Sequence, residues 1–351
     1  MNKITHQAFL AVDLPVIQAP MAGVQDSALT LAVAEGGGLG SLPCAMLSPQ
    51  QIEDEVRLLK ARSDKPFNLN FFCHQMPAYD EARQSAWRTL LRPYFDELLL
   101  DCPDQPGASS RLPFNHEIAD RLEPFKPEVI SFHFGVPEHS VLKRLQSWGS
   151  TILSTATTVN EALFLEAKGI DGIIAQGLEA GGHRGLFLDK DLSTQMGTLS
   201  LLPQVLNKVS VPVIAAGGIA DAAGVKAVLD LGAVAAQVGT AYLLCDEAKT
   251  SPLHRAALQS QAASHTTLTT LFSGRPARGI VNRVIRELGA MPDAVVDFPY
   301  AASEITLLRQ AAEACGSDDF SPLWCGQNAT GCRSVSAAEL TRILGAEWAG
   351  S

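Results

Sequence analysis

The residues best suited to chemistry lie between positions 171 and 185, in the stretch DGIIAQGLEAGGHRG. The apolar run 172–175 predicts a buried strand that ends at Gln176, and the glycine-rich loop after it carries His183. Glycine tolerates positive φ and lets backbone N–H groups approach a ligand closely. A histidine there can move a proton or pair with an anion near neutral pH, although a turn histidine is the commoner case. His183 is therefore the candidate catalytic residue.

Two further glycine loops offer backbone donors for an anion. The stretch AAGGIAD at 215–221 follows an apolar run and opens onto a predicted helix, and QVGT at 237–240 ends the next apolar run. Helix N-termini favour phosphate, and the loops after strands seven and eight form the recurrent phosphate site of TIM barrels. We therefore predict a phosphate-bearing ligand, although the glycines could instead serve only tight turns. The residues concerned are Gly217, Gly218, Gln237, Val238, Gly239 and Thr240.

Polar residues at other predicted strand ends suit a flavin. The amides of Asn70, Gln176 and Gln237 can face the hydrogen-bonding edge of an isoalloxazine ring. Residues Ala19, Pro20 and Met21 can supply an apolar backbone wall. Because no separate adenine-binding fingerprint is recognisable, a mononucleotide is favoured over a dinucleotide.

The pattern of apolar runs predicts the scaffold that positions these residues. Eight strands are expected, nearly all separated by a helix, which implies parallel strands joined by right-handed crossovers. Eight such units over about 240 residues favour an α/β fold of the (β/α)8 TIM barrel type over an open sheet. The expected strands are 15–20, 39–43, 66–72, 129–134, 151–155, 172–175, 212–216 and 233–238.

The remaining chain predicts an insertion and a small appended domain. We expect a barrel over 1–244 with an insertion at about 73–127, a small substrate-side domain at 245–300, and C-terminal helices at 301–351 that return to the barrel. Arg275 and Arg278 lie near glycines and could be turn or phosphate-facing residues, and solvated charges are the default interpretation. Candidate walls of the substrate pocket are Phe298, Tyr300 and Trp324, with core packing as the alternative.

Composition and charge narrow the class of partner. The chain has 46% hydrophobic and 18% charged residues and a net charge of −10, which argues against nucleic acid and anionic membranes and favours a small molecule. No apolar stretch reaches the roughly 18 residues of a membrane span, so we expect a cytoplasmic protein, either monomer or homodimer. Seven scattered cysteines without a C-x-x-C pair predict reduced thiols, and nothing completes a metal site around Cys73 and His74.

Eight motifs together resemble the nitronate monooxygenases, formerly called 2-nitropropane dioxygenases, over essentially the whole chain. They are QAPMAG (18–23), FNLNFF (67–72), SFHFG (131–135), AQGLEAGGHRG (175–185), AAGGIAD (215–221), QVGTAYL (237–243), SGRPARGIVN (273–282) and WCGQN (324–328). The EAGGH-x-G loop is shared with flavin-dependent enoyl-acyl-carrier-protein reductases and quinone reductases. The stretches NFFCH and SFHFG point more narrowly to the bacterial class I nitronate enzymes.

The resemblance implies a barrel that binds FMN non-covalently and oxidises alkyl nitronates with O₂ to a carbonyl compound and nitrite. The expected substrate is propionate 3-nitronate, and the activity would be detoxifying. By position, His183 would be catalytic and His133 would line the substrate side. The family's lysine after the small domain is absent, and that segment offers Tyr300 and Arg309. FMN would be held by Met21, Asn70, Gln176, Gly181, Gly218, Gln237, Gly239 and Thr240.

Several roles and functions stay open from the sequence. His183 can act as a general base or, when protonated, pair with the nitronate oxygens, and we favour charge stabilisation. His133 can equally be a buried structural histidine, and Glu179 is expected to cap the loop rather than orient His183. The alternative functions are a flavin-dependent NAD(P)H reductase of a quinone or enoyl thioester and a non-catalytic barrel that binds a phosphate-bearing ligand.

Overall fold

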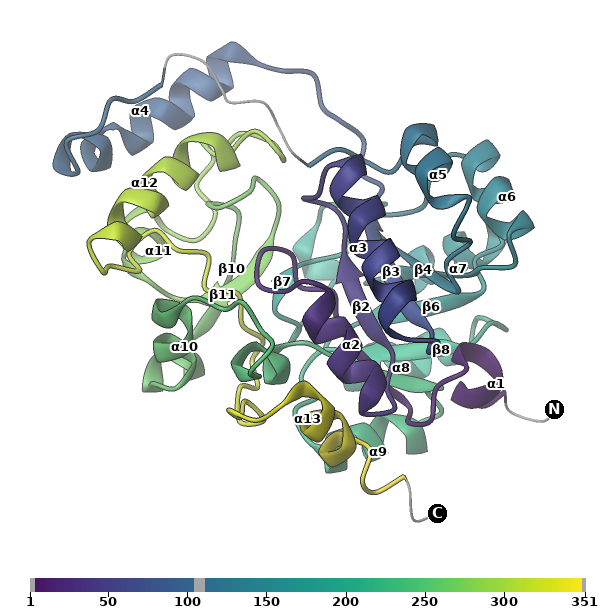
Figure 1. Cartoon of the computed structure of the whole chain (residues 1–351). Helices are drawn as coiled ribbons and strands as arrows, with labels where there is room; N and C mark the ends of the chain where they lie inside the picture. Colours follow the sequence, from purple (N-terminus) through teal and green to yellow (C-terminus); the bar gives the residue numbers. More distant parts are fainter. Residues whose placement is uncertain (1–3, 104–110, 349–351) are drawn as a thin grey trace.

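Eight parallel strands form a closed barrel in this computed structural model, which describes residues 4–103 and 111–348 (Figure 1). The strand order is β1-β9-β8-β6-β5-β4-β3-β2, and a parallel bridge between Ile17 and Leu39 joins its two ends. Nearly all strand residues are buried, as expected of parallel strands covered by helices. The predicted TIM barrel is confirmed. The strands are β1 (Val16–Gln18), β2 (Gly40–Pro43), β3 (Phe67–Phe72), β4 (Val129–His133), β5 (Thr151–Ala156), β6 (Gly172–Gln176), β8 (Val213–Ala216) and β9 (Ala235–Val238).

Helices that follow the strands cover the outside of the barrel (Figure 1). Their starts are specified locally: Ser48 forms a capping box with Gln51 before α3, and Asp221 accepts a hydrogen bond from Gly224 N at the start of α9. Inside the barrel, Ile174 of β6 packs in one cluster with Leu10 of α1. The helices are α1 (His6–Leu10), α2 (Ser27–Glu35), α3 (Pro49–Arg62), α5 (His116–Leu122), α6 (His139–Ser147), α7 (Val159–Ala167), α8 (Thr198–Leu206) and α9 (Ala222–Asp230), with short 3-10 turns η1 (Leu192–Thr194) and η2 (Thr240–Leu244).

A second hydrophobic cluster lies outside the barrel. Its residues include Trp87 and Leu91 from the insertion and Ile305 and Leu308 from near the C-terminus. We call the elements around this cluster the second lobe. They are α4 (Glu81–Glu97), β10 (Thr266–Thr269), β11 (Ala277–Ile280), α11 (Arg283–Leu288) and α12 (Ala302–Ala314), and α10 (Pro252–Leu258) with η3 (Gln261–Ser264) leads into them. After α10, β10 and β11 pair antiparallel as a hairpin.

The two C-terminal helices go to different places. Helix α13 (Ala337–Leu344) packs against α2 and α9, so its expected return to the barrel is confirmed. Helix α12 instead lies beside α4 in the second lobe (Figure 1), which corrects the expectation that 303–314 also covers the barrel. The reason is that α12 buries its apolar face against Trp87 and Leu91 of the insertion, a partner that helical periodicity alone does not reveal. Residues 104–110 of the predicted insertion lie outside the described residues.

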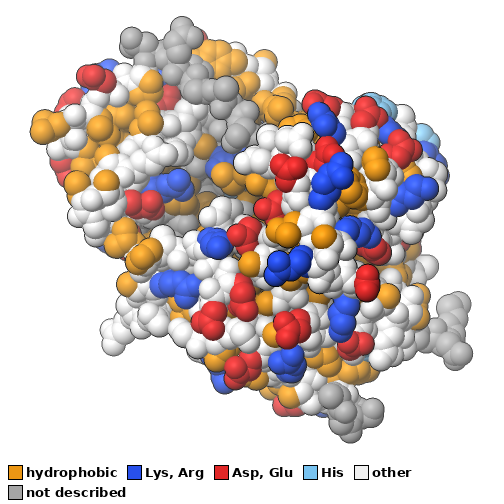
Figure 2. Space-filling model, viewed as in Figure 1, with side chains coloured by type: hydrophobic (Ala, Val, Ile, Leu, Met, Phe, Trp, Pro, Cys, Tyr) orange, Lys and Arg blue, Asp and Glu red, His pale blue; other side chains and the backbone are white. Residues whose placement is uncertain are grey.

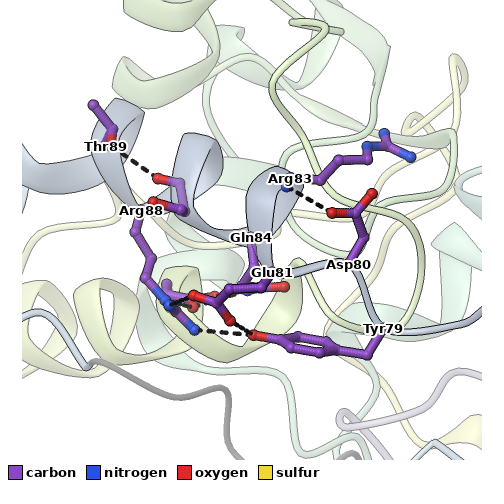
Figure 3. Close-up of polar contacts among 9 residues, drawn as sticks. Tyr79, Asp80, Glu81, Arg83, Gln84, Arg88 and Thr89 are labelled. Carbon is purple, nitrogen blue, oxygen red and sulfur yellow. Dashed lines mark hydrogen bonds and ion pairs between the residues drawn. The ribbon is translucent and has the colours of Figure 1, made fainter.

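A buried polar network fixes α4 on α12. Glu304 of α12 is fully buried, and it accepts hydrogen bonds from Gln84 at 2.8 and 2.9 Å and from Arg88 Nε at 3.1 Å. Figure 3 shows Arg88 also reaching Glu81 and the hydroxyl of Tyr79 at the start of α4. A buried carboxylate with several donors is satisfied only while both helices stay in register. The network therefore fixes the position of α12 relative to α4.

The loop that carries His183 belongs to both parts of the molecule. Gly182 and His183 form the short strand β7, which leaves the end of β6 and pairs antiparallel with β11 of the second lobe. The resulting three-stranded sheet has the order β10-β11-β7. His183 is thus placed where the carboxyl ends of the barrel strands face the second lobe, the usual position of active sites in this fold.

Acidic and basic side chains are interspersed over the barrel on the face that Figure 2 shows. Among the residues that the structure describes, none of the helices has the length and apolar character needed to cross a membrane. The described part also brings together no cluster of three or more His, Cys, Asp or Glu side chains that could hold a metal ion.

Candidate functional site

His183 is held by backbone bonds on one side and a hydroxyl on the other. Its backbone pairs with Ala277, and its Nε2 lies 2.8 Å from Ser273 Oγ. Burial, followed by the charge of Arg111, lowers the pKa of His183 well below the usual value. The imidazole is therefore neutral near pH 7, which leaves one ring nitrogen as a hydrogen-bond acceptor. The sequence analysis favoured a protonated imidazole that pairs with an anion, and it foresaw neither the burial of this ring nor the arginines near it.

Aromatic rings surround the imidazole. The ring centroids of Phe134 and Phe298 each lie 5.8 Å from that of His183, and those of Trp324 and Phe72 lie at 5.7 and 6.2 Å. The structure thus brings Phe298 and Trp324, both expected pocket residues, next to the candidate catalytic histidine. These rings exclude water from the imidazole, which explains why burial is the largest cause of its lowered pKa.

His133 lies beneath the loop and supports it. Its Nε2 donates to the carbonyl oxygen of His183 at 3.2 Å, and its Nδ1 lies 3.1 Å from Thr155 Oγ1. Burial lowers the pKa of His133 to about 3, so the ring is neutral and both nitrogens have protein partners. This geometry fits the structural alternative, in which His133 positions His183. Tyr300 donates to Pro77 O at 3.4 Å and packs edge-on against Tyr79, away from the opening beside His183.

Arg184 is a functional residue that sequence reasoning missed. Its side chain is fully buried, and its guanidinium donates to the carbonyl oxygens of Gly177 at 2.6 Å and Gln176 at 2.8 Å. It also donates to Gln195 Oε1 at 2.9 and 3.1 Å. Arg184 therefore ties the start of the loop to its end. No local pattern distinguishes such an arginine from a solvated one, because its partners are carbonyl groups.

The glycines after β8 form a cradle that side chains would fill. Gly217 and Gly218 have φ of +109° and +74°, conformations that other residues rarely adopt. A Cβ on Gly217 would lie 3.1 Å from Ala180 N, and one on Gly218 would lie 3.3 Å from Glu179 Cβ. Glu179 was expected to cap its own loop, and it accepts hydrogen bonds from Thr198 N at 2.9 and 3.0 Å, so it caps the start of α8. Both glycines therefore let the backbone after β8 pack closely against the loop that carries His183.

Three other segments meet at this cradle. Gly239 faces Ala19, since a Cβ on Gly239 would lie 3.4 Å from Ala19 Cβ and 4.0 Å from Met21 Sδ. A Cβ on Gly181 would lie 2.5 Å from Gly326 N, and that N–H donates to Thr240 Oγ1 at 2.9 Å. The structure therefore brings together the predicted cofactor residues at 19–21, 181, 217–218 and 239–240, and it adds the WCGQN segment at 324–328.

The side-chain amides of the three predicted residues differ in how many of their polar atoms already have a partner in the protein. Gln176 donates to His183 O at 3.0 Å and accepts from Gly185 N at 2.8 Å, so its amide is used inside the loop. Asn70 donates to Ser131 Oγ at 2.9 Å. Gln237 Oε1 is buried and has no hydrogen-bond partner within the described residues. Since buried acceptors are rarely left unpaired, Gln237 points to a donor that a bound ligand would supply.

The second lobe contributes positive charge to the site. An opening beside His183 is lined by Arg111, Arg309, Thr306 and Trp324, among others. The expectation that Arg275 and Arg278 are solvated is wrong. Arg278 is 5% exposed and donates to Leu178 O at 3.0 Å, while burial lowers the pKa of Arg275 to about 10. Arg278 is covered because β7 pairs with β11, and Arg275 is covered by the rings of Phe134 and Phe298.

Comparisons with known proteins agree over nearly the whole chain. The family model described as nitronate monooxygenase matches residues 3–347. The chain is 40% identical over 339 residues to a nitronate monooxygenase of Pseudomonas aeruginosa, covering 95% of this chain and 96% of that protein. It is 41% identical to a nitronate monooxygenase of Paraburkholderia phytofirmans, with 95% and 92% covered.

A solved structure extends the likeness to three dimensions. The nitroalkane oxidase of Streptomyces ansochromogenes superposes with a TM-score of 0.89 at 38% sequence identity, covering 97% of this chain and 96% of that one. FabK from Thermotoga maritima superposes with a TM-score of 0.70 at 22% identity, covering 98% and 96%, which is a likeness of fold alone.

Proposed function

Because the chain belongs to the nitronate monooxygenase family, whose members are oxidoreductases, we propose that it oxidises alkyl nitronates with O₂ at a bound FMN. The products would be a carbonyl compound and nitrite, and the activity would be detoxifying. The observation that carries the proposal is the buried, unpartnered Gln237 Oε1 beside a glycine cradle on the same barrel rim as a neutral His183.

The residues of the barrel rim fit a flavin mononucleotide. Gly217, Gly218 and Gly239 offer backbone without side chains for the phosphate, and Gln237 offers an acceptor for a ring N–H. At the start of α9, Asp221 caps Gly224 N, and in this proposal the glycine N–H groups before it also donate to the phosphate. The other holding residues in this proposal are Ala19, Pro20, Met21, Asn70, Gln176, Gly181, Val238 and Thr240. A bound FMN supplies the electron acceptor for the nitronate and the donor for O₂.

His183 is the catalytic residue of the proposal. Its neutral Nε2 sits against Ser273 Oγ and can accept the α-proton of a neutral nitroalkane, while a preformed nitronate requires no such step. His133 holds the backbone of this residue, and we propose that it acts on the substrate side through that support. Tyr300 has an indirect place, since it braces the segment before α4 rather than facing the opening.

A carboxylate on the substrate would meet the second lobe. Arg111 and Arg309 line one opening with His183, and the charge of Arg309 contributes to the lowered pKa of Arg111 after burial. Two close guanidinium groups favour an anion between them. We therefore propose propionate 3-nitronate as the substrate, with arginine in the role for which the family uses lysine. In this scheme the barrel within 1–244 carries FMN, and 245–300 together with α4 and α12 forms the substrate side.

The test is to purify the protein, record its absorption spectrum and measure O₂ consumption and nitrite release with propionate 3-nitronate, with NADH as the comparison. We expect flavin absorption, turnover of the nitronate and no consumption of NADH. A colourless protein that takes up no added FMN would contradict the proposal. Anaerobic bleaching by NADH would favour the reductase alternative, and FMN binding without either turnover would favour a binding barrel.

A further inference from the structure

Arg275 is a charged side chain in the site for which the functions above give no role. Its guanidinium carbon lies 4.1 Å from the ring centroid of Phe134 and 5.7 Å from that of Phe298. Its guanidinium makes a long hydrogen bond, from Nη1 to Leu186 O at 3.4 Å. Within the described residues, no carboxylate lies at ion-pair distance from Arg275, and the nearby Asp297 pairs with Arg83 at 2.8 Å.

Such a guanidinium is short of partners. Burial lowers the pKa of Arg275 to about 10, so the group stays charged near neutral pH while it has lost much of its hydration. The ring of Phe134 stabilises one face of the cation, but the N–H donors lie in the plane of the guanidinium and are not satisfied by a ring. A charged group in this state favours an anion at its edge.

The charge of Arg275 acts in the space of the catalytic histidine. Phe134 and Phe298, over which it lies, are the two rings with centroids 5.8 Å from His183. Its charge is among the causes that lower the pKa values of His183, His133 and His74. Arg111 and Arg275 both act on His183 with a positive charge. Arg275 and His183 also share the rings of Phe134 and Phe298 as neighbours, so an anion at these rings lies close to both side chains.

We propose that Arg275 binds the reacting end of the substrate, the planar O–N–O group of the nitronate, through its in-plane N–H donors. A nitronate presents two oxygens in one plane as a carboxylate does, and this matches the fork of a guanidinium. The inference rests on the proposed function and deepens it. Arg275 binds the anionic O–N–O group that every nitronate carries, whereas Arg111 and Arg309 bind a second anionic group at the other end of the substrate.

The test measures equilibrium binding of two carboxylates that cannot be turned over. Butyrate mimics a nitronate with one negative end, and succinate mimics propionate 3-nitronate with two. Both are titrated calorimetrically into the FMN-loaded protein and into the variants Arg275→Met, Arg275→Lys and Arg309→Met. Arg286→Met is the control, since it removes an exposed charge from the same lobe.

Arg275→Met should weaken both ligands about 30- to 100-fold, the usual effect of removing one partner of a desolvated charge pair. Arg275→Lys should weaken them about tenfold, because the charge remains without the planar fork. Arg309→Met should weaken succinate and leave butyrate unchanged, and Arg286→Met should change neither.

Wild-type affinity for butyrate in Arg275→Met would overturn the inference, and so would failure of the wild-type protein to bind either carboxylate. If Arg275→Met does not retain FMN, Arg275→Lys decides in the same way. The proposed function fails separately, because it needs nitronate turnover and these ligands do not. Unchanged turnover of propyl 1-nitronate in Arg275→Met would overturn the role of Arg275 and leave nitronate oxidation standing.

Discussion

The barrel side of the candidate site and the side formed by the second lobe are lined by different chemical groups. On the barrel side, the ends of β8 and β9 offer bare backbone and neutral amides, as at Gly218 and Gln237. On the side of the second lobe, the opening is made of arginines and aromatic rings, as at Arg309 and Trp324. Backbone donors suit a constant group such as a phosphate, whereas side chains can vary with the substrate. The difference suggests that the cofactor and the substrate are recognised by separately adjustable parts.

The largest expected effect comes from breaking the second lobe alone. Glu304→Ala removes the carboxylate that Arg88 and Gln84 share, and it leaves the guanidinium of Arg88 without its buried partner. Loss of one member of a buried pair costs about 3–5 kcal/mol in the free energy of unfolding. Urea denaturation should show this loss, while flavin absorption at the barrel rim persists in the folded protein.

The matched control is Glu81→Ala, which removes the exposed partner of the same arginine. An exposed pair contributes about 1 kcal/mol or less. Equal losses in the two variants would show that the buried network does not hold the second lobe.

The next largest effect is expected from replacing His183, which lies between the barrel and the second lobe. His183→Asn should lower nitronate turnover about 10²-fold or more, in the range for lost acid–base or charge-stabilising groups, with FMN content unchanged. His139→Asn, which alters an exposed histidine at the start of α6, should leave kcat/KM at the wild-type value. Full turnover in His183→Asn would remove this imidazole from the reaction.

A smaller effect is expected from filling the cradle. Gly218→Val places a β-branched residue at φ +74° and a Cβ 3.3 Å from Glu179 Cβ. The crowded Cβ should displace the backbone of Gly218 and Glu179, so FMN should bind roughly tenfold more weakly or worse, as measured by fluorescence quenching. The strain at positive φ, about 1–3 kcal/mol, lowers only the stability of the fold. Gly149→Val is the matched control, because Gly149 has φ +80° with no atom within 4 Å of an added Cβ. It should be strained to a similar degree yet bind FMN normally, and equal FMN loss would argue against a cradle at Gly218.

The smallest effect is a change in pH dependence. Burial, followed by the charge of Arg275, lowers the pKa of His74 to about 4. Between pH 6.5 and about 4, His74 is therefore protonated in the unfolded chain and neutral in the native state. The free energy of unfolding falls as the pH drops through this window. His74→Phe keeps the ring contacts with Phe298 and removes the titration. The drop in Tm between pH 7 and pH 5 should shrink by a few degrees, and an unchanged drop would exclude His74 as a cause.

The barrel half was readable from the sequence because its signals are local. Apolar runs of strand length alternate with helices, and the glycines at 217–218 stand directly after one such run. The cap role of Glu179 followed from the same loop. Each of these features depends on residues within a few positions of one another, or on a repeat along the chain.

The other half was not readable because its partners are distant in sequence. Ser273 meets His183 across 90 positions, and Glu304 meets Gln84 across 220. Arg275 and Arg184 look like solvated charges until the segments that cover them are placed. For the same reason the predicted location of α12 was wrong. The apolar periodicity of a helix shows which face is buried, and it does not show which element covers that face.

The pairing of β7 with β11 has a consequence for how the enzyme can be modified. The backbone of His183 is hydrogen-bonded into a sheet whose other strands belong to the second lobe, although its chain emerges from the barrel. Transplanting the loop alone into a related barrel would leave His183 without the backbone pairing that fixes its position. Exchanging the segment from β10 to β11, which includes Ser273, together with the loop would transfer His183 with its partners, and the glycine cradle could stay unchanged.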